Sequence, residues 1–374
     1  MKVSSALLTL LFAVSVLVIS LYFTQQNNSV QKVADHPDWL AELKTEKADL
    51  NRIEIYTKQN QLLVDAKLEN SVWVAANMAN YPLQVKPISA WFNSVLNAKN
   101  VEPKTNNAEK FYKLGLDDPS LKTTMANSHA KPASLVKLTA GKSYHLLLGN
   151  FASSGQGQYV RRQDSHQTWL LNQQINLPTS IMDWINPSLF TWTPEQVDMI
   201  SVHQVITGEQ FKIERHQPKA ELLLDQTETS AQFSDVEDNQ ADASQFEQTN
   251  VNWYLTPLTD NQTLKSEQTV IDFIQNLADI EFLNASKIQA DVWQSEARTL
   301  VQIGFQDDSL LSLNLLASDQ QYWLRVMSQG SGEIATHHTQ LSQWQFEISA
   351  VSFEQINLKQ AHFLESQSEQ KISE

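Results

Sequence analysis

The chain lacks cysteine altogether and has few glycines. Its 374 residues include no cysteine and nine glycines. The first absence excludes disulfide bonds, thiolate zinc sites, cysteine nucleophiles and lipid attachment through cysteine. The second is consistent with the absence of a phosphate-cradling loop, because such loops depend on glycine.

Positive charge is also scarce. The chain has 27 lysines and arginines against 42 acidic residues, for a formal net charge of −15. Phosphate backbones are bound by clustered lysine and arginine, and the sequence contains no such cluster. We therefore expect no nucleic acid among the partners. A chain of this length suggests two or three domains.

The amino terminus carries a long apolar run. Residues 3–23 contain no charged side chain, and a helix of that length reaches about 30 Å, the thickness of a bilayer core. The run exceeds the apolar core of a signal peptide, and the bulky exit Leu21–Thr24 is unlike a cleavage site. We expect an uncleaved transmembrane anchor over residues 1–24. Lys2 is a weak signal that the bulk of the chain lies in the periplasm, beyond the inner membrane.

The remaining pattern predicts an α+β protein with two similar β-rich units, each a mainly antiparallel sheet with packed helices. The expected divisions are a stalk at 25–50, a first unit at 51–195, a second unit at 196–360 and a polar tail at 361–374. Trp39, Leu40 and Leu43 would lie on one side of a short helix in the stalk, although we favour a spacer there.

The first unit begins with short strands and continues into a helix. Val72–Val74 alternates as a strand does, Tyr81-Pro82-Leu83 makes a turn, and an apolar helical stripe follows at Ile88, Trp91, Phe92, Val95 and Leu96. Such a stripe is far more often core than the lining of a ligand groove. The other expected strands are 53–56, 62–64, 122–126, 134–138, 144–148, 158–161 and 168–171, before a closing helix at 178–185.

The same order returns in the second half. Trp253 matches Trp73, and a helical stripe follows at Val270, Phe273, Ile274, Leu277 and Ile280. Strands are expected at 197–205, 210–214, 300–305, 310–316 and 322–327. Tyr322–Arg325 resembles Tyr159–Arg161, and residues 341–346 with Trp344 resemble the closing helix around Trp184. This order predicts an internal duplication.

An acidic stretch interrupts the second copy. Residues 225–250 contain seven acidic side chains and no lysine, arginine or histidine, so the net charge without them is −15 + 7 = −8. A calcium loop would need a central glycine, which the stretch lacks. We predict a solvated, disordered insertion.

The residue pairs that suggest chemistry all have simpler interpretations. Asp117-Asp118 and Asp307-Asp308 are predicted turns, and Gly149–Gly157 is predicted to be a hairpin connection rather than an anion loop. Arg161 and Arg162 are expected to pair with carboxylates. The adjacent histidines His337 and His338 would point to opposite faces of a strand. We therefore predict no catalytic, cofactor-binding or metal-binding residue, and no cofactor.

Several short motifs occur in a familiar order. They are Asn70–Trp73, Tyr81–Leu83, Leu114–Pro119 and Leu148-Gly149 followed by Tyr159–Arg161. Together with the anchor, they resemble the domain-of-unknown-function family four-three-four-zero (DUF4340) over most of residues 53–190. The resemblance implies a bacterial envelope protein linked to an ABC-type export system related to gliding-motility transporters. It supplies no catalytic residues.

Two functions remain open. The first is a non-enzymatic accessory subunit of an ABC-type transport system, anchored in the inner membrane through residues 3–23 and acting by protein–protein contacts with transporter subunits or other envelope proteins. The second is an anchored periplasmic enzyme or binding protein for an envelope glycan or peptide. Fold and repetition alone do not decide between them.

Overall fold

The described part of the chain forms two compact units. The computed structural model describes residues 36–122, 124, 128–153, 155–216, 252–295 and 297–365. Within these, unit 1 comprises 36–74 and 83–184, and unit 2 comprises 75–82 and 185–365. The predicted anchor and the acidic stretch 225–250 lie outside the described residues. Inside the described ranges, no helix combines the length and apolar character needed to cross a membrane.

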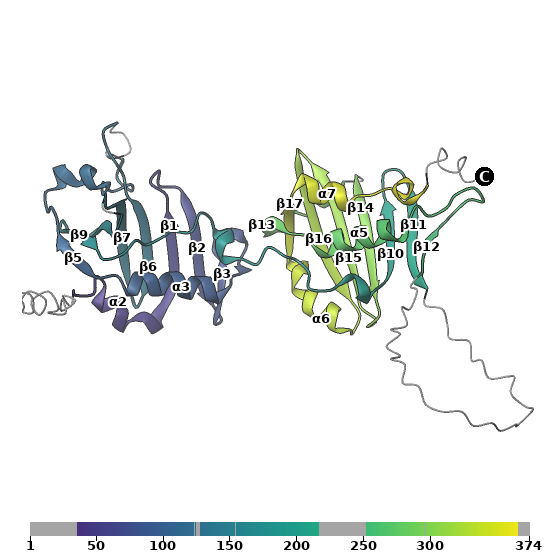
Figure 1. Cartoon of the computed structure of the whole chain (residues 1–374), viewed down its shortest axis with the longest axis horizontal. Coiled ribbons are helices and arrows are strands. Elements are labelled where there is room, and N and C mark those ends of the chain that lie inside the picture. Colours follow the sequence, from purple (N-terminus) through teal and green to yellow (C-terminus); the bar gives the residue numbers. More distant parts are fainter. Residues whose placement is uncertain are drawn as a thin grey trace, which may run out of the picture. The chain divides into compact units, whose positions relative to one another are not determined.

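Unit 1 is built on an antiparallel sheet. Its strands lie in the order β3-β2-β1-β6-β7-β8-β9-β5 (Figure 1). Their bounds are β1 Leu50–Tyr56, β2 Leu62–Glu69, β3 Val72–Ala75, β5 Asn100–Pro103, β6 Ser134–Ala140, β7 Lys142–Phe151, β8 Gln158–Arg162 and β9 Thr168–Leu171. The helices are α2 Ala41–Thr45, η1 Lys47–Asp49, α3 Val85–Leu96, η3 Ala108–Leu114 and η4 Ile181–Trp184.

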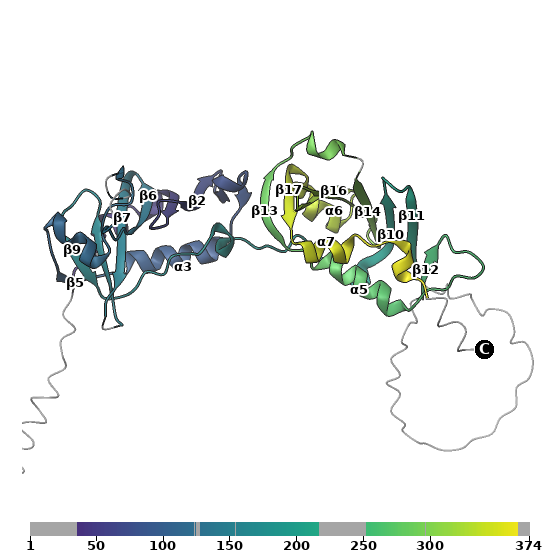
Figure 2. The same cartoon turned by 90° about the horizontal axis from the view of Figure 1, so that it is seen from above.

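The two faces of this sheet are covered differently. Helix α3 runs along one face (Figure 2), and all five residues of its predicted stripe are buried. Burying each such side chain contributes roughly 1.5–3 kcal/mol. The opposite face carries a separate apolar cluster of Phe111, Leu116, Ala133, Leu135 and Leu147. The described residues between 108 and 133, called the cover of residues 108–133 below, therefore close the second face.

Unit 2 repeats this strand order. Its sheet reads β12-β11-β10-β14-β15-β16-β17-β13, with α5 and α7 along one face (Figure 2). The strands are β10 Val197–Gln204, β11 Glu209–His216, β12 Asn252–Thr256, β13 Phe282–Lys287, β14 Arg298–Phe305, β15 Leu310–Ser318, β16 Gln321–Gln329 and β17 Trp344–Ile348. The helices are η5 Pro194–Gln196, α5 Glu267–Ala278, η6 Val292–Gln294, α6 Glu333–His338, η7 Thr339–Gln343, α7 Ala350–Ile356 and η8 Gln360–Phe363.

The predicted duplication is therefore present as a shared topology. Each unit has three strands, a helix, an edge strand and four further strands in the same connection. Trp73 and Trp253 occupy matching second positions in β3 and β12. In unit 1 the β2–β3 connection is the two-residue turn Asn70-Ser71, both with positive φ. In unit 2 the same connection contains the acidic stretch.

Some predicted elements were wrong. Trp344 begins strand β17, the counterpart of β9, so it does not match the closing helix around Trp184. Lys122 and Thr124 are helical rather than extended, and the rest of the strand predicted at 122–126 lies outside the described residues. The edge strands β5 of unit 1 and β13 of unit 2 were not predicted. Both are short and carry exposed polar positions, so they lack the alternation that marks a strand.

The outer boundaries also differ from the prediction. Trp39, Leu40 and Leu43 are buried, and the Trp39 amide donates to the Ala98 carbonyl at 2.9 Å. Residues 36–50 therefore belong to unit 1 rather than to a stalk. At the other end, Phe363 is completely buried against Phe211 and Phe273. The predicted polar tail thus begins too early.

A segment from the first half of the sequence belongs to unit 2. Residues 75–82 contain η2 (Ala76–Met78) and β4 (Tyr81–Pro82). The Tyr81 ring lies 4.9 Å from Phe282 and 5.0 Å from Trp344, between ring centroids. The Trp344 indole N–H donates to the Ala79 carbonyl at 3.0 Å. The chain accordingly passes between the units after residues 74, 82 and 184.

Candidate functional site

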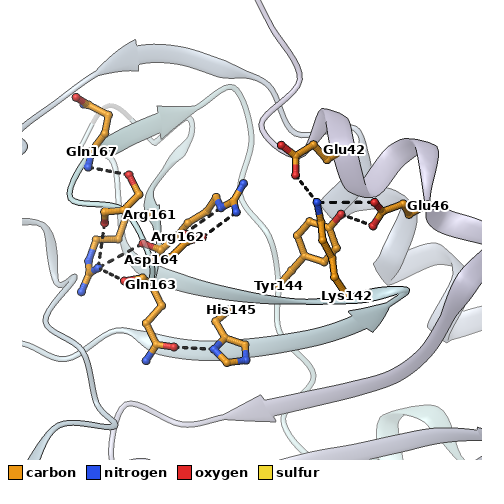
Figure 3. A network of polar contacts seen from close by, with 11 residues as sticks. Glu42, Glu46, Lys142, Tyr144, His145, Arg161, Arg162, Gln163, Asp164 and Gln167 are labelled. Carbon is orange, nitrogen blue, oxygen red and sulfur yellow. Dashed lines mark hydrogen bonds and ion pairs between the residues drawn. The ribbon is translucent and has the colours of Figure 1, made fainter.

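A network of polar side chains on unit 1 is the first candidate site (Figure 3). The Lys142 ammonium lies 2.7 Å from the Glu42 carboxylate and 3.7 Å from that of Glu46. The Tyr144 hydroxyl donates to Glu46 at 2.6 Å. These contacts join helix α2, and Glu46 directly after it, to the beginning of strand β7. Lys142 and Glu42 are both about half exposed, and exposed ion pairs of this kind contribute little to stability.

The electrostatics of this network keep its groups in one protonation state. The hydrogen bond from Lys142 lowers the pKa of Glu42, and the reciprocal bond raises the pKa of Lys142. Burial, followed by the hydrogen bond to Glu46, raises the pKa of Tyr144. Each of these shifts moves a pKa away from neutrality. A general acid or base requires a pKa near the operating pH, so the geometry suits fastening rather than proton transfer.

Arg161 and Arg162 at the end of β8 point to opposite faces of the sheet. Arg162 pairs with Asp164 at 2.9 Å, as predicted. Arg161, by contrast, makes no ion pair with a carboxylate of the described residues. Its guanidinium donates to the carbonyls of Leu116, Arg162, Gln163 and Ser165 at 3.2 to 3.4 Å.

The surroundings of Arg161 are largely apolar. The side chain is 5% exposed, and its guanidinium lies 4.5 Å above the centre of the Phe111 ring. Burial lowers the pKa of Arg161, and the charges of Asp118 and Asp117 act in the opposite direction. Four carbonyls and an aromatic face satisfy the cation, which therefore fastens the cover of residues 108–133 to the sheet.

Asp117 and Asp118 form the turn predicted from the sequence. Asp118 accepts from the Ser120 amide at 2.9 Å and from the Gln163 amide group at 2.7 Å. Asp117 accepts from the Lys131 amide at 2.9 Å. The two carboxylates thus have separate partners and do not act as an acid–base pair.

The other predicted turns and pairs are also structural. Asp307 accepts from the amides of Ser309 and Ile334, at 3.0 and 3.1 Å, in the β14–β15 turn. His337 and His338 lie on helix α6 rather than on a strand, and His338 is buried with Nδ1 at 2.6 Å from the Ile334 carbonyl. Gly149 lies within strand β7 and Gly157 directly precedes β8, so the hairpin connection is shorter than predicted. Across the described ranges, no three potential ligand side chains gather closely enough to hold a metal ion.

A shallow groove in unit 1 is the second candidate site. Its cavity has a volume of about 300 Å³ and is lined by Pro87, Trp91, Asn176, Pro178, Asp183 and Trp184, among others. The two indole rings lie 5.6 Å apart between centroids. Trp91 and Trp184 are only 7% and 3% exposed, so neither presents a ring face on which a sugar or base could stack.

Sequence reasoning missed the network and the position of Tyr81. Glu42 and Lys142 are 100 residues apart, and no local pattern links them. Tyr81 was noted as part of a turn motif, but its aromatic partners all lie beyond residue 280. Only the unusual Tyr-Pro pair between a strand and a helix marked the position.

Comparison with known families identifies the family of this chain. The family described as "Domain of unknown function (DUF4340)" matches residues 73–282, more than half of the chain. The fold defines a duplicated antiparallel α+β protein, and the chain belongs to the DUF4340 family. The match begins in β3 and ends at the first residue of β13, so it includes parts of both units. No curated protein matches, and no solved structure matches.

Proposed function

We propose that the protein is a non-enzymatic accessory subunit of an ABC-type transport system, anchored in the inner membrane with its two units in the periplasm. The observation that carries the proposal is the repetition of one complete strand order in two units. A duplicated module provides two related surfaces on one chain, and linked surfaces bind a multi-subunit partner more tightly than either does alone.

The polar groups of the described residues support this proposal. The carboxylates of Glu42, Asp118, Asp164 and Asp307 all have lowered pKa values, with hydrogen bonds to lysine, serine, glutamine, arginine or backbone donors. They stay charged over the physiological range and serve as acceptors within the fold. Catalytic carboxylate pairs have pKa values pushed apart by their surroundings, which is a different arrangement.

The groove beside Trp91 and Asp183 is the feature that the alternative would use, an anchored enzyme or binding protein that holds an envelope glycan or peptide by polar contacts rather than by ring stacking. It combines two indoles, a carboxylate and an amide around one small cavity. An Asp183→Ala variant with unchanged behaviour of the host cell envelope would leave the accessory role as the better proposal.

The accessory role is tested by recovering partners from native membranes. The full chain, with a carboxyl-terminal tag, is cross-linked in cells, solubilised gently and purified, and the bound proteins are identified by mass spectrometry. We expect a permease and an ATPase of one ABC system. A matched control replaces residues 1–24 with a cleavable signal peptide, which should reduce recovery through loss of the anchor. Recovery of the full chain without either subunit would refute the proposal.

A further inference from the structure

The face of the unit 2 sheet that lies opposite α5 and α7 carries an unusual group of polar side chains. In the antiparallel register Arg325 of β16 lies opposite Asn314 of β15, and Arg298 of β14 lies opposite Leu316. Directly opposed residues share one face, and residues two apart on one strand share it too. Arg298, Asn314 and Arg325 therefore project from three neighbouring strands onto the same face.

The Arg325 guanidinium stands over an aromatic ring. It lies 5.4 Å from the centre of Trp293, and the Trp293 indole N–H is fixed by the Gln345 side chain at 2.9 Å. Burial, followed by the positive charge of Arg298, lowers the pKa of Arg325. Two arginines thus share one face of this sheet, in a chain whose net charge is −15.

Within the described residues, these side chains have few polar contacts, although Arg325 lies over the Trp293 ring. The Arg298 Nε atom is buried without a hydrogen bond. Asn314 is 9% exposed, and no hydrogen bond joins its amide or the Arg325 guanidinium to another described group. A buried polar atom without a partner, here Arg298 Nε, costs free energy. An oxyanion bound at this position would supply the missing acceptors.

Unit 1 shows what the same position looks like when the chain itself satisfies it. Arg161 is the counterpart of Arg325: each lies on the strand after the central hairpin and stacks on an aromatic ring from a 3₁₀ helix. Arg161 donates to four carbonyls, and the residue opposite it is the buried Leu147. In unit 2 the residue at that place is Asn314.

The cover over this face also differs between the units. In unit 1, 30 residues separate β5 from β6 and include the apolar cluster; in unit 2, only ten separate β13 from β14. The shorter connection places Trp293 beneath Arg325, but none of its described residues offers a carbonyl to the Arg325 guanidinium. Trp323, on the same face two residues before Arg325, stays partly exposed.

We propose that Arg298, Asn314 and Arg325 form an oxyanion-binding site on unit 2, which takes the carboxylate or phosphate group of a ligand whose apolar part packs against Trp323. A guanidinium group binds a carboxylate or a phosphate through two parallel hydrogen bonds. A carboxamide supplies a further donor beside them. This site does not depend on the transporter partnership proposed above.

The site is tested by fluorine NMR of the full chain in detergent micelles, labelled with 5-fluorotryptophan. The Trp293 and Trp323 signals are assigned with Trp→Phe variants. Inorganic phosphate, sulfate and succinate are titrated separately at constant ionic strength, with chloride as reference. We expect the Trp293 and Trp323 signals to shift and saturate with phosphate or succinate, whereas the Trp91 and Trp184 signals of unit 1 stay in place. The stronger of the two anions identifies the ligand's acidic group.

Matched variants make the test decisive. Arg325→Gln and Arg298→Gln should each weaken binding by about tenfold or more, because each removes a charge-assisted contact. Arg325→Lys, which keeps the charge but loses the fork, should retain weak binding. Arg162→Gln, an arginine of unit 1 that pairs with Asp164, should leave binding unchanged. Unshifted signals of the remaining tryptophans report that each variant is folded.

Three results would overturn the proposal. One is the absence of a saturable shift with any of the three anions. Another is an equal shift in wild type and in Arg325→Gln. The third concerns Glu296, which stands two residues before Arg298 in the sequence and outside the described residues. If binding appears only in Glu296→Gln, the chain's own carboxylate occupies the position and no external ligand is taken.

Discussion

At the scale of the residue, Asp118 is the clearest case of an acidic side chain used as part of the architecture. It is 7% exposed and accepts from Ser120 and Gln163. Through Gln163, it connects the cover of residues 108–133 to the β8–β9 turn. The carboxylate was noticeable in the sequence only as half of an acidic pair before proline, and that pattern identified the turn but not the long-range partner.

The stability of unit 1 should depend on the charge of Asp118. Burial acts to raise its pKa, but the hydrogen bonds from Ser120 and Gln163 and the charge of Arg161 outweigh it, so the pKa lies below the ordinary 3.8. A lowered pKa stabilises the fold above pH 3.8, and this contribution is lost as the pH falls through the lower, folded value. Urea unfolding of unit 1 at a series of pH values should show this loss.

The variant Asp118→Asn provides the comparison. It should cost about 1–3 kcal/mol at pH 7, because hydrogen bonds to a charged acceptor are lost, and its stability should vary less with pH below 4. If the acid dependence of the variant matches that of wild type, Asp118 is not the titrating group. The unfolding of unit 2, which lacks this residue, serves as an internal reference.

At the scale of the element, the helices followed the sequence closely and the edge strands did not. The stripes of α3 and α5 are apolar at helical spacing over three turns, and such long patterns outweigh local irregularities. The edge strands β5 and β13 have four and six residues, with backbone partners on one side. Strand β17 follows the 3₁₀ helix η7 directly, so the whole stretch resembled one helix.

Helix α5 offers a prediction at this scale. Ser266 caps it: its Oγ atom accepts from the Thr269 amide at 3.2 Å. Ser266→Ala should therefore cost about 0.5–2 kcal/mol. The matching N-cap of α3 is Gln84, whose side chain makes no cap, so Gln84→Ala should cost much less. Chemical denaturation measures both, and equal losses would show that the capping bond contributes nothing.

At the scale of the whole molecule, the sequence revealed the duplication but not the path of the chain. The matched order of strands, tryptophans and helices identified two similar units. The predicted boundary lay between residues 195 and 196. The units instead divide after residue 184, and residues 75–82 belong to unit 2. The placement of residues 75–82 in unit 2 depends on aromatic partners of Tyr81 that lie more than two hundred residues away along the chain. No local periodicity records them. The shared face of Arg298 and Arg325 in unit 2 was missed for the same reason.

Tyr81→Ala should consequently loosen unit 2 rather than unit 1. The ring contacts Phe282, Trp344 and Phe346, and its removal should cost about 2–4 kcal/mol, somewhat below a fully buried aromatic because Tyr81 is partly exposed. Hydrogen exchange should quicken at the amides of β13 and β17 and stay unchanged in β1 and β6. Tyr81→Phe keeps the ring and should behave as wild type. Faster exchange confined to unit 1 would contradict the assignment.

The passage of residues 75–82 into unit 2 has a consequence for how the chain is made. A ribosome delivers Tyr81 more than two hundred residues before Phe282 and Phe346, so residues 75–82 have no aromatic partners until nearly all of the chain has emerged. Unit 1 can fold earlier, while residues 75–82 still lack their partners in unit 2. For the same reason, a protease that severs the backbone between residues 184 and 185 should not free the two halves from each other.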